Sequence, residues 1–271
     1  MADWADNTDV DKVREVWDGF AREYGTDSRA STPDAYMVEL EIRTLLRYFR
    51  NGEKVLDIGC GNGYTDIKLL QRRNLYLTGI DISPELINLA KQLASKHADR
   101  IRNSPEYIVD NVLDSTFEQR FKQASFDSIL TKRAIINILT WEEQRAVIAR
   151  IARLIRPGGR YIMIEATVQG HERIGNLREK FGMTKTPIRW HNRYLDENEL
   201  IPYLNEQFGT VYLNDFSSTY YVGSRLIQPL LLKPFRKEPR YDFFLNNIFS
   251  RLPSIGDFGL QKLIICRKKG S

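Results

Sequence analysis

The sequence has little of what marks secreted, membrane or fibrous proteins. Its 271 residues include only two cysteines, Cys60 and Cys266. This excludes a disulfide scaffold, and a reducing, cytoplasmic location is expected. No apolar run reaches the roughly 18 residues that a membrane-spanning helix needs, so no membrane span is expected. The first segment, MADWADNTDVDKV, is acidic and polar, which does not fit a secretory signal.

Charge of one sign is also scarce. There are 40 basic and 35 acidic residues, for a net charge of +5. Apart from the RKK tripeptide at 267–269, the basic residues are spread along the chain. Proteins that bind nucleic acid usually concentrate them in a patch or stripe. A nucleic-acid partner is therefore not expected.

The chain shows no internal repeat, but it does show a regular alternation of elements. Periodicity predicts helices at about 11–25 and 31–49, the second with Thr32 as N-cap and Pro33 in its first turn. Strands and helices then alternate. Strands are expected at 54–59, 75–81, 106–110, 126–131 and 160–167, helices at 64–73, 83–98 and 140–155, and a turn at 156–159. This alternation predicts an α/β domain of parallel βαβ units.

The pattern weakens beyond Thr167. A helix is expected at 196–208 and strands at 211–216 and 260–268. The segment between those two strands is rich in aromatic residues and proline. We expect it to form a cap or substrate loop rather than a separate domain.

A glycine-rich loop follows the first strand of this pattern. In VLDIGCGNG, the strand reaches Asp57, and Gly59, Gly61 and Gly63 follow at alternate positions. Ligands of open parallel sheets bind beyond the carboxyl ends of the strands, where glycine allows close approach to the backbone. The loop matches neither G-x-G-x-x-G nor a P-loop. A carboxylate beside such a loop suits a ligand with a cationic end and no phosphate.

With these residues the chain resembles the class I S-adenosylmethionine-dependent methyltransferases of the small-molecule and saccharide type, whose first motif is similar to VLDIGCGNG. The resemblance covers roughly residues 10–167 and the final strands. It implies a Rossmann-like, seven-stranded, mostly parallel sheet with helices on both faces and an antiparallel last strand. It divides the chain into an N-terminal helical lid (1–50), a core (51–216 and 258–271) and a cap insertion (217–257).

The resemblance implies S-adenosyl-L-methionine as the cofactor. Asp81 ends the second strand and would accept hydrogen bonds from both ribose hydroxyls, and Asp110 would accept one from the adenine amino group. Packing within the protein is the alternative for Cys60 and for two lid aromatics, Tyr24 and Tyr36. The complete predicted set is Tyr24, Tyr36, Asp57, Gly59, Cys60, Gly61, Gly63, Asp81, Ile82, Asp110, Asn111, Val112, Thr131 and Arg133.

Fewer residues in the sequence point to the methyl acceptor. Arg133 and Asn137 follow the fourth strand, where Arg133 would meet an anionic or carbonyl-bearing acceptor, or the cofactor carboxylate, with surface charge as the alternative. His171 and His191 are candidate general bases, with an ordinary loop position as the alternative. We therefore take His171, Arg133 and His191 as candidate catalytic residues.

Aromatic and basic residues in the expected cap suit stacking on a sugar face and pairing with a phosphate or carboxylate. They are Tyr220, Tyr221, Arg225, Arg236, Tyr241, Phe243 and Phe244.

The predicted function is in-line methyl transfer to a small molecule or saccharide, with an oxygen as the leading acceptor atom. The setting suggested is natural-product or polysaccharide biosynthesis. There is no Asn/Asp-Pro-Pro-Tyr motif, and no acidic cluster follows the fourth strand, so no metal is expected. An RNA-modifying methyltransferase, a small-molecule N-methyltransferase and a non-catalytic cofactor-binding protein stay as alternatives. The oligomeric state is open between monomer and homodimer.

Overall fold

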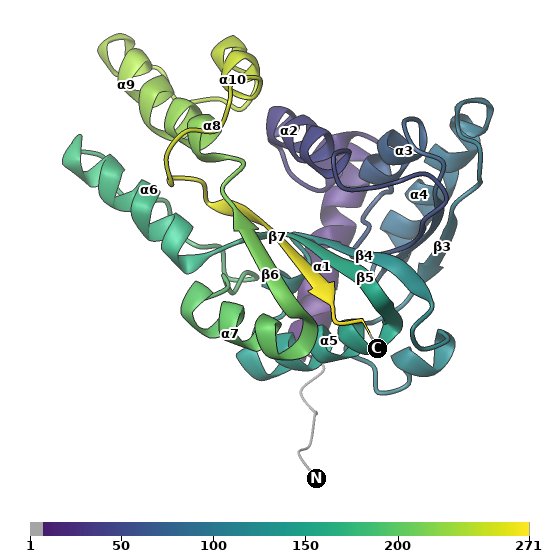
Figure 1. The fold of residues 1–271 in the computed structure, drawn as a ribbon. Coiled ribbons are helices and arrows are strands. Elements are labelled where there is room, and N and C mark those ends of the chain that lie inside the picture. Colours follow the sequence, from purple (N-terminus) through teal and green to yellow (C-terminus); the bar gives the residue numbers. More distant parts are fainter. Residues whose placement is uncertain (1–7, 271) are drawn as a thin grey trace.

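A single seven-stranded sheet runs through the computed structural model, which describes residues 8–270 (Figure 1). Residues 1–7 of the predicted lid and Ser271 lie outside the described residues. The strands are β1 (Lys54–Ile58), β2 (Tyr76–Asp81), β3 (Glu106–Val109), β4 (Phe126–Lys132), β5 (Ile155–Ala166), β6 (Gly209–Asn214) and β7 (Gln261–Lys268).

The strand order is β3-β2-β1-β4-β5-β7-β6. Strands β1 to β5 pair in parallel, whereas β7 runs antiparallel to both β5 and β6. The chain builds outward from β1 in one direction and then returns to add β4, so the switch point lies between β1 and β4. The predicted Rossmann-like, mostly parallel sheet with an antiparallel last strand is confirmed.

Helices cover both faces of this sheet (Figure 1). On one face, α5 and α7 pack through a cluster that includes Val147, Ile151 and Leu204. On the other, α2, α3 and α4 pack through a cluster that includes Leu45, Ile67 and Ile87. The helices before the cap are α1 (Thr8–Tyr24), α2 (Ala35–Leu45), α3 (Tyr64–Leu70), α4 (Pro84–Lys96), α5 (Trp141–Leu154), α6 (Val168–Lys180) and α7 (Glu197–Phe208).

Residues 217–257, the predicted cap, contain several short helical segments. They are α8 (Ser218–Val222), the π-helical turn η5 (Gly223–Ile227), α9 (Gln228–Leu232), the 3-10 turn η6 (Lys233–Phe235) and α10 (Phe244–Phe249). Tyr220 and Tyr221 of α8 are buried in the same cluster as Leu45. We keep the names lid and cap for 8–50 and 217–257, although the domain boundaries themselves stay a prediction.

Two predicted helix starts are confirmed and one is wrong. Ser83 and Thr140 cap α4 and α5 by accepting the backbone N–H groups of Leu86 and Glu143. The N-cap of α2, however, is Asp34 rather than Thr32: its carboxylate accepts the Met37 N–H at 3.2 Å. A carboxylate at this position accepts from a helix N–H that has no partner within the helix. Its negative charge is also stabilised by the positive end of the helix dipole.

Two further elements differ from expectation. The segment 156–159, expected as a turn, lies within β5 as a bulge, since the register jumps between Phe126 and Ser128 of β4. Helix α6 was not predicted at all, because its buried positions are few: Gly170, Ile174 and Gly175. A Cβ on Gly170 would lie 2.4 Å from the Gly259 carbonyl oxygen, so α6 is held by close backbone approach rather than by an apolar stripe.

Within residues 8–270, no helix combines the length and the apolar character that crossing a bilayer requires.

Candidate active site

The glycine loop lies at the switch point, directly after the buried strand β1. Its start is fastened to β2, because the N–H groups of Gly59 and Cys60 both donate to the Ile80 carbonyl, at 2.8 and 3.0 Å. Gly59, Gly61 and Gly63 all have positive φ, at 77°, 58° and 71°. The loop therefore takes a left-handed path that glycine adopts without strain.

The three glycines serve different purposes. A Cβ on Gly59 would lie 2.6 Å from the Ala134 Cβ, and one on Gly63 would lie 2.6 Å from the Tyr107 hydroxyl. A Cβ on Gly61 would meet no heavy atom within 4 Å. Gly59 and Gly63 are therefore needed for packing inside the protein, and Gly61 alone faces open space.

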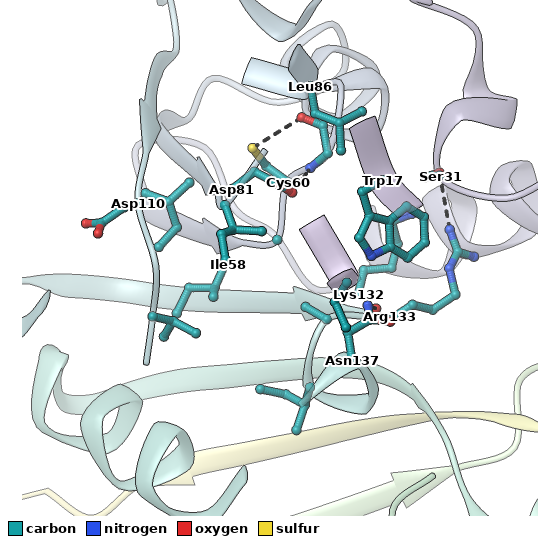
Figure 2. Close-up of a pocket in the computed structure, with 18 of the residues that line it drawn as sticks. Trp17, Ser31, Ile58, Cys60, Asp81, Leu86, Asp110, Lys132, Arg133 and Asn137 are labelled. Carbon is teal, nitrogen blue, oxygen red and sulfur yellow. Dashed lines mark hydrogen bonds between the residues drawn. The ribbon is translucent and has the colours of Figure 1, made fainter. Parts of the chain in front are cut away.

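That open space is a cavity across the tips of β1, β2 and β3, shown in Figure 2, which we call the loop cavity. Helix α1 contributes Trp17 to its wall, and the lid contributes Ser31. The cavity brings together many of the predicted cofactor residues: Gly59, Cys60, Gly61, Asp81, Ile82, Asp110, Asn111, Val112 and Arg133.

Asp81 is held in a fixed orientation at the end of β2. One carboxylate oxygen accepts the Gly61 N–H at 2.9 Å and the other accepts the Ser83 N–H at 2.9 Å. Burial raises the pKa of Asp81 to about 6, and these backbone hydrogen bonds oppose the rise. Each oxygen keeps a second lone pair, so the carboxylate can accept from two hydroxyls of a ligand.

Asp110 lies at the opposite side of the loop cavity from Trp17 and Arg133 (Figure 2). Its Oδ1 pairs with Arg120 at 2.6 Å. Its Oδ2 is buried and has no hydrogen-bond partner among residues 8–270. A buried acceptor without a partner is costly, and an amino group of a ligand would satisfy it.

Two of the predicted cofactor residues are buried behind the cavity wall instead. Asp57 faces Asp66 of α3; burial raises the pKa of Asp57 to about 6, and burial together with Asp57 raises that of Asp66. The Thr131 hydroxyl lies 3.0 Å from the Tyr161 hydroxyl, within the sheet's core. Contact of either side chain with a ligand is not supported by this geometry.

Gly63, Tyr24 and Tyr36 also lie outside the cavity wall. Tyr24 stacks on Phe20 with ring centroids 6.2 Å apart, and Tyr36 packs against the cluster beneath α2. For Tyr24 and Tyr36 the structure thus favours packing within the protein over contact with a cofactor. Gly63 is the N-cap of α3 and makes room for Tyr107, as described above.

A second cavity adjoins the first, and we call it the cap cavity. Trp17, Ser31, Arg133 and Asn137 line both, so the two meet at these side chains. Further parts of its wall come from the lid, from α6, from the segment 186–194 and from the cap. Of the cap residues singled out above, Tyr221, Arg225 and Tyr241 line it, whereas Tyr220, Arg236, Phe243 and Phe244 do not.

Arg133 stands at the junction in a constrained conformation. Its φ is +56°, in the left-handed region that few non-glycine residues occupy. Its guanidinium donates to the Glu41 carboxylate at 2.5 Å and to the Ser31 hydroxyl at 3.3 Å. Glu41 is fully buried in α2 and also lies 3.4 Å from the Lys132 ammonium. The lid therefore fixes the two cations that follow β4.

Both predicted histidines line the cap cavity. His171 lies on α6, and its Nε2 is 2.7 Å from the Thr186 carbonyl oxygen. His191 is buried between Trp17 and Trp190, whose rings meet it edge-on at 6.0 and 5.5 Å. Burial, and secondarily Arg189, lower the pKa of His191, so it stays neutral near pH 7.

The sequence prediction missed several residues of this site. Trp17 was recognised only as part of an amphipathic helix, and Ser31 and Glu41 were not singled out. Glu41 could have been found, because it stands among Val38, Ile42 and Leu45 on the buried side of α2. A carboxylate on such a face needs a cation. Within the described residues, no three His, Cys, Asp or Glu side chains form a possible metal site.

Comparisons with known proteins point to one family. Residues 55–159 match a family model described as "Methyltransferase domain". The O-methyltransferase rstn1 of Aspergillus nomiae is 26% identical over 140 residues, which cover 50% of this chain and 58% of that relative. The chain spans about half the length of the curated relatives it matches.

Solved structures share the fold. Magnesium protoporphyrin IX methyltransferase from Synechocystis PCC 6803, with bound SAH, is 15% identical with a TM-score of 0.60, over 96% of this chain and 100% of its own. The [4+2]-cyclase SpnF is 17% identical with a TM-score of 0.54, over 86% of this chain and 82% of its own. The fold is therefore common to proteins of different activity, and the site has to indicate the reaction.

Proposed function

Because residues 55–159 form a class I S-adenosylmethionine-dependent methyltransferase domain, we propose that the protein transfers a methyl group from S-adenosylmethionine to a small-molecule oxygen. The family expected from the sequence is confirmed. The acceptor, the activity of the whole chain and the role of each site residue are proposals.

One observation carries the proposal: the loop cavity and the cap cavity share the wall formed by Trp17, Ser31, Arg133 and Asn137. Methyl transfer needs a donor and an acceptor that lie end to end in a site closed to water. Two adjoining cavities, one beside the glycine loop and one lined by the lid, α6, the segment 186–194 and the cap, provide such an arrangement.

The residues of the loop cavity fit S-adenosylmethionine. Asp81 would accept from the ribose hydroxyls, and the buried free Oδ2 of Asp110 would accept from the adenine amino group. Gly61 leaves room for a ligand against the backbone. Arg133 stands at the junction, where a carboxylate of the cofactor or of the acceptor could pair with it. When bound, the cofactor supplies a methyl group already activated by the sulfonium. The protein therefore mainly aligns the acceptor with this methyl group and excludes water from the site.

A hydroxyl acceptor must also lose a proton, and His171 is suited to receive it. The Thr186 carbonyl can only accept, so the His171 Nε2 donates a hydrogen to it, and in the neutral imidazole the lone pair is then on Nδ1. This tautomer is the one a general base needs at Nδ1. His191 is the second candidate, because its lowered pKa also keeps it unprotonated.

The setting is proposed from the relatives. One is named an O-methyltransferase of Aspergillus nomiae, another a ubiquinone biosynthesis O-methyltransferase of Xanthomonas oryzae. These names support a natural-product or cofactor-like acceptor, and the arginines and tyrosines of the cap cavity are also compatible with a saccharide. A cytoplasmic location is part of the proposal, because Cys60 and Cys266 are both buried and unpaired.

Two measurements test this function. Isothermal titration with S-adenosylhomocysteine should show one binding site per chain. Incubation of the protein with methyl-tritiated S-adenosylmethionine and fractionated metabolite extract should label a small molecule whose mass rises by one methylene. Label appearing only in RNA would favour the RNA-modifying alternative, and cofactor binding with no labelled product in any fraction would favour a non-catalytic role.

A further inference from the structure

The cap cavity has an unbalanced charge. Its wall holds a single carboxylate, Asp34, and four arginines: Arg133, Arg178, Arg189 and Arg225. Two of these cations are neutralised within the protein, since Arg225 pairs with Asp34 at 2.9 Å and Arg133 pairs with Glu41 behind the wall. Among the described residues, Arg178 and Arg189 have no carboxylate within ion-pair distance.

Arg178 is positioned but not neutralised. Its Nε donates to the Thr184 carbonyl at 3.0 Å, and its Nη1 donates to the Arg225 carbonyl. Both acceptors are neutral, and a guanidinium has five N–H donors, so donors on Nη1 and Nη2 stay available. Burial and the nearby Arg225 cation both lower the pKa of Arg178. An anion bound beside this guanidinium would stabilise its charged form and so offset both causes of the lowered pKa.

Asp34 cannot serve as that anion. Its carboxylate already accepts from the Arg225 guanidinium, the Tyr220 hydroxyl and the Met37 N–H. The same contacts join the lid to the cap, so Asp34 and Arg225 form the frame of the cavity. Arg178 thus lies next to the Asp34–Arg225 ion pair, while no carboxylate neutralises its own guanidinium.

Arg189 adds a second free cation, on the segment between α6 and α7. It lies near His191 and Tyr194, since its charge lowers the pKa of His191 and opposes the burial-driven rise in that of Tyr194. Neither Arg178 nor Arg189 lines the loop cavity. They therefore stand in the part of the cap cavity that is separate from the junction where the methyl group would be transferred.

From this geometry we infer that the acceptor carries an anionic group, a carboxylate or a phosphate, which binds to Arg178 and Arg189 while its reacting oxygen lies at the junction. The inference rests on the proposed function and deepens it by naming the substrate class. A guanidinium with free Nη donors matches either anion, because both offer two oxygens to one fork. Tyr194 and Tyr241 also line the cavity, so their side chains can contact the body of such an acceptor.

The test uses the whole chain loaded with S-adenosylhomocysteine and three probes. Two are anionic, 4-hydroxyphenylacetate and 4-hydroxyphenyl phosphate, and the third is the uncharged 4-hydroxyphenylacetamide. Their affinities are measured by ligand-observed NMR titration. We expect at least one anionic probe to bind about tenfold or more tightly than the amide, as charge-assisted hydrogen bonds would give. The preferred anion distinguishes a carboxylate from a phosphate acceptor.

Single-residue variants test which arginines cause the preference for the anionic probes. Arg178→Gln and Arg189→Gln should each remove most of the preference for the anion. Arg236→Gln should keep it, because it removes the same charge but lies outside both cavities. The Arg189 side chain makes no hydrogen bond or ion pair with the described residues, so its variant stays informative even if Arg178→Gln is unstable.

Three results would overturn the inference: equal binding of anion and amide, a preference that survives in the folded Arg178 and Arg189 variants, or no binding of either anion at millimolar concentration. Failure of the unmodified protein to bind S-adenosylhomocysteine is a different outcome and would contradict the proposed function. Cofactor binding without anion preference would leave that function standing and remove only the substrate class.

Discussion

The loop cavity and the cap cavity adjoin, but they are built in different ways. The loop cavity is made mainly by strand ends and the loops that follow them, with Trp17 and Ser31 added by α1 and the lid. The Asp81 carboxylate in its wall is held by backbone N–H groups. The cap cavity is made by side chains from the lid, α6, the segment 186–194 and the cap. Its frame is the pairing of Asp34 with Arg225, residues separated by 191 positions.

This difference explains what each cavity can specify. A cavity formed by backbone at a switch point depends little on neighbouring side chains, so one motif can define a common ligand. A cavity formed by side chains of distant segments changes with every substitution in them. The first suits a cofactor shared across a family, and the second suits an acceptor particular to one protein.

The largest effect is expected from Gly61→Val, which should abolish cofactor binding. The new side chain would project into the loop cavity, where a Cβ meets no protein atom, and the left-handed φ adds roughly 1–2 kcal/mol of strain. Titration with S-adenosylhomocysteine should show no binding, while circular dichroism shows a folded chain.

Gly63→Ala is the matched control for that change. Its Cβ would collide with Tyr107 rather than enter the cavity, so it should lower the melting temperature more than it weakens cofactor binding. If Gly61→Val bound the cofactor normally, the loop cavity would not be the cofactor site.

Glu41→Gln tests the junction between the cavities. It would leave Lys132 and Arg133, which are both largely buried, facing a neutral amide. Breaking a buried ion pair from one side should lower the free energy of unfolding by about 3 kcal/mol, as measured by urea denaturation. Glu39→Gln on the same helix removes a charge but keeps an oxygen that can accept from the Tyr64 hydroxyl, so it should cost well under half of that. Equal losses would mean that the lid does not hold Arg133 in place.

His171→Asn sharpens the comparison on the acceptor side. It should lower kcat about a hundredfold, as removal of a general base does, and leave the affinity for S-adenosylhomocysteine unchanged because His171 lies outside the loop cavity. If His191→Asn gave the larger loss, the base would be the buried histidine beside Trp17.

Asp81→Asn should have the smallest of these effects, about a tenfold loss of cofactor affinity from weaker hydrogen bonds. The pKa of Asp81 is raised to about 6 by burial, so its carboxylate form declines as the pH falls through that value. Affinity for S-adenosylhomocysteine should therefore fall below about pH 6 in the unmodified protein and change less in the variant. An unchanged affinity at pH 7.5, where the carboxyl is ionised, would remove Asp81 from the ribose site.

The same contrast explains how much the sequence predicts. The alternation of strands and helices and the positions of Gly61 and Asp81 follow from local patterns, whereas the antiparallel last strand was expected only from the family resemblance. The structure confirms the sheet and brings Gly61 and Asp81 together. Thr131 was misplaced because adjacent residues of a strand point to opposite faces. Its hydroxyl turns into the core toward Tyr161.

Other features could not be predicted, because they depend on pairing across the chain. Nothing local marks Asp34 as the partner of Arg225, or Glu41 as the partner of Arg133. Helix α6 has too few apolar positions to show a helical period. Its Gly170 lies against the backbone of the loop before β7, which leaves no room for a Cβ, and its Gly175 faces the Lys185 side chain. The sequence therefore indicated only which types of residue would surround the methyl acceptor, and not how those residues pair.

The central claim is that a methyl donor in the loop cavity faces an acceptor in the cap cavity across Trp17 and Arg133. A crystal structure of the protein with S-adenosylmethionine tests it most directly. The account predicts the ribose on Asp81, the adenine beside Asp110 and the methyl group directed toward the shared wall. Density for the cofactor outside the loop cavity, or a methyl group directed away from the cap cavity, would contradict it.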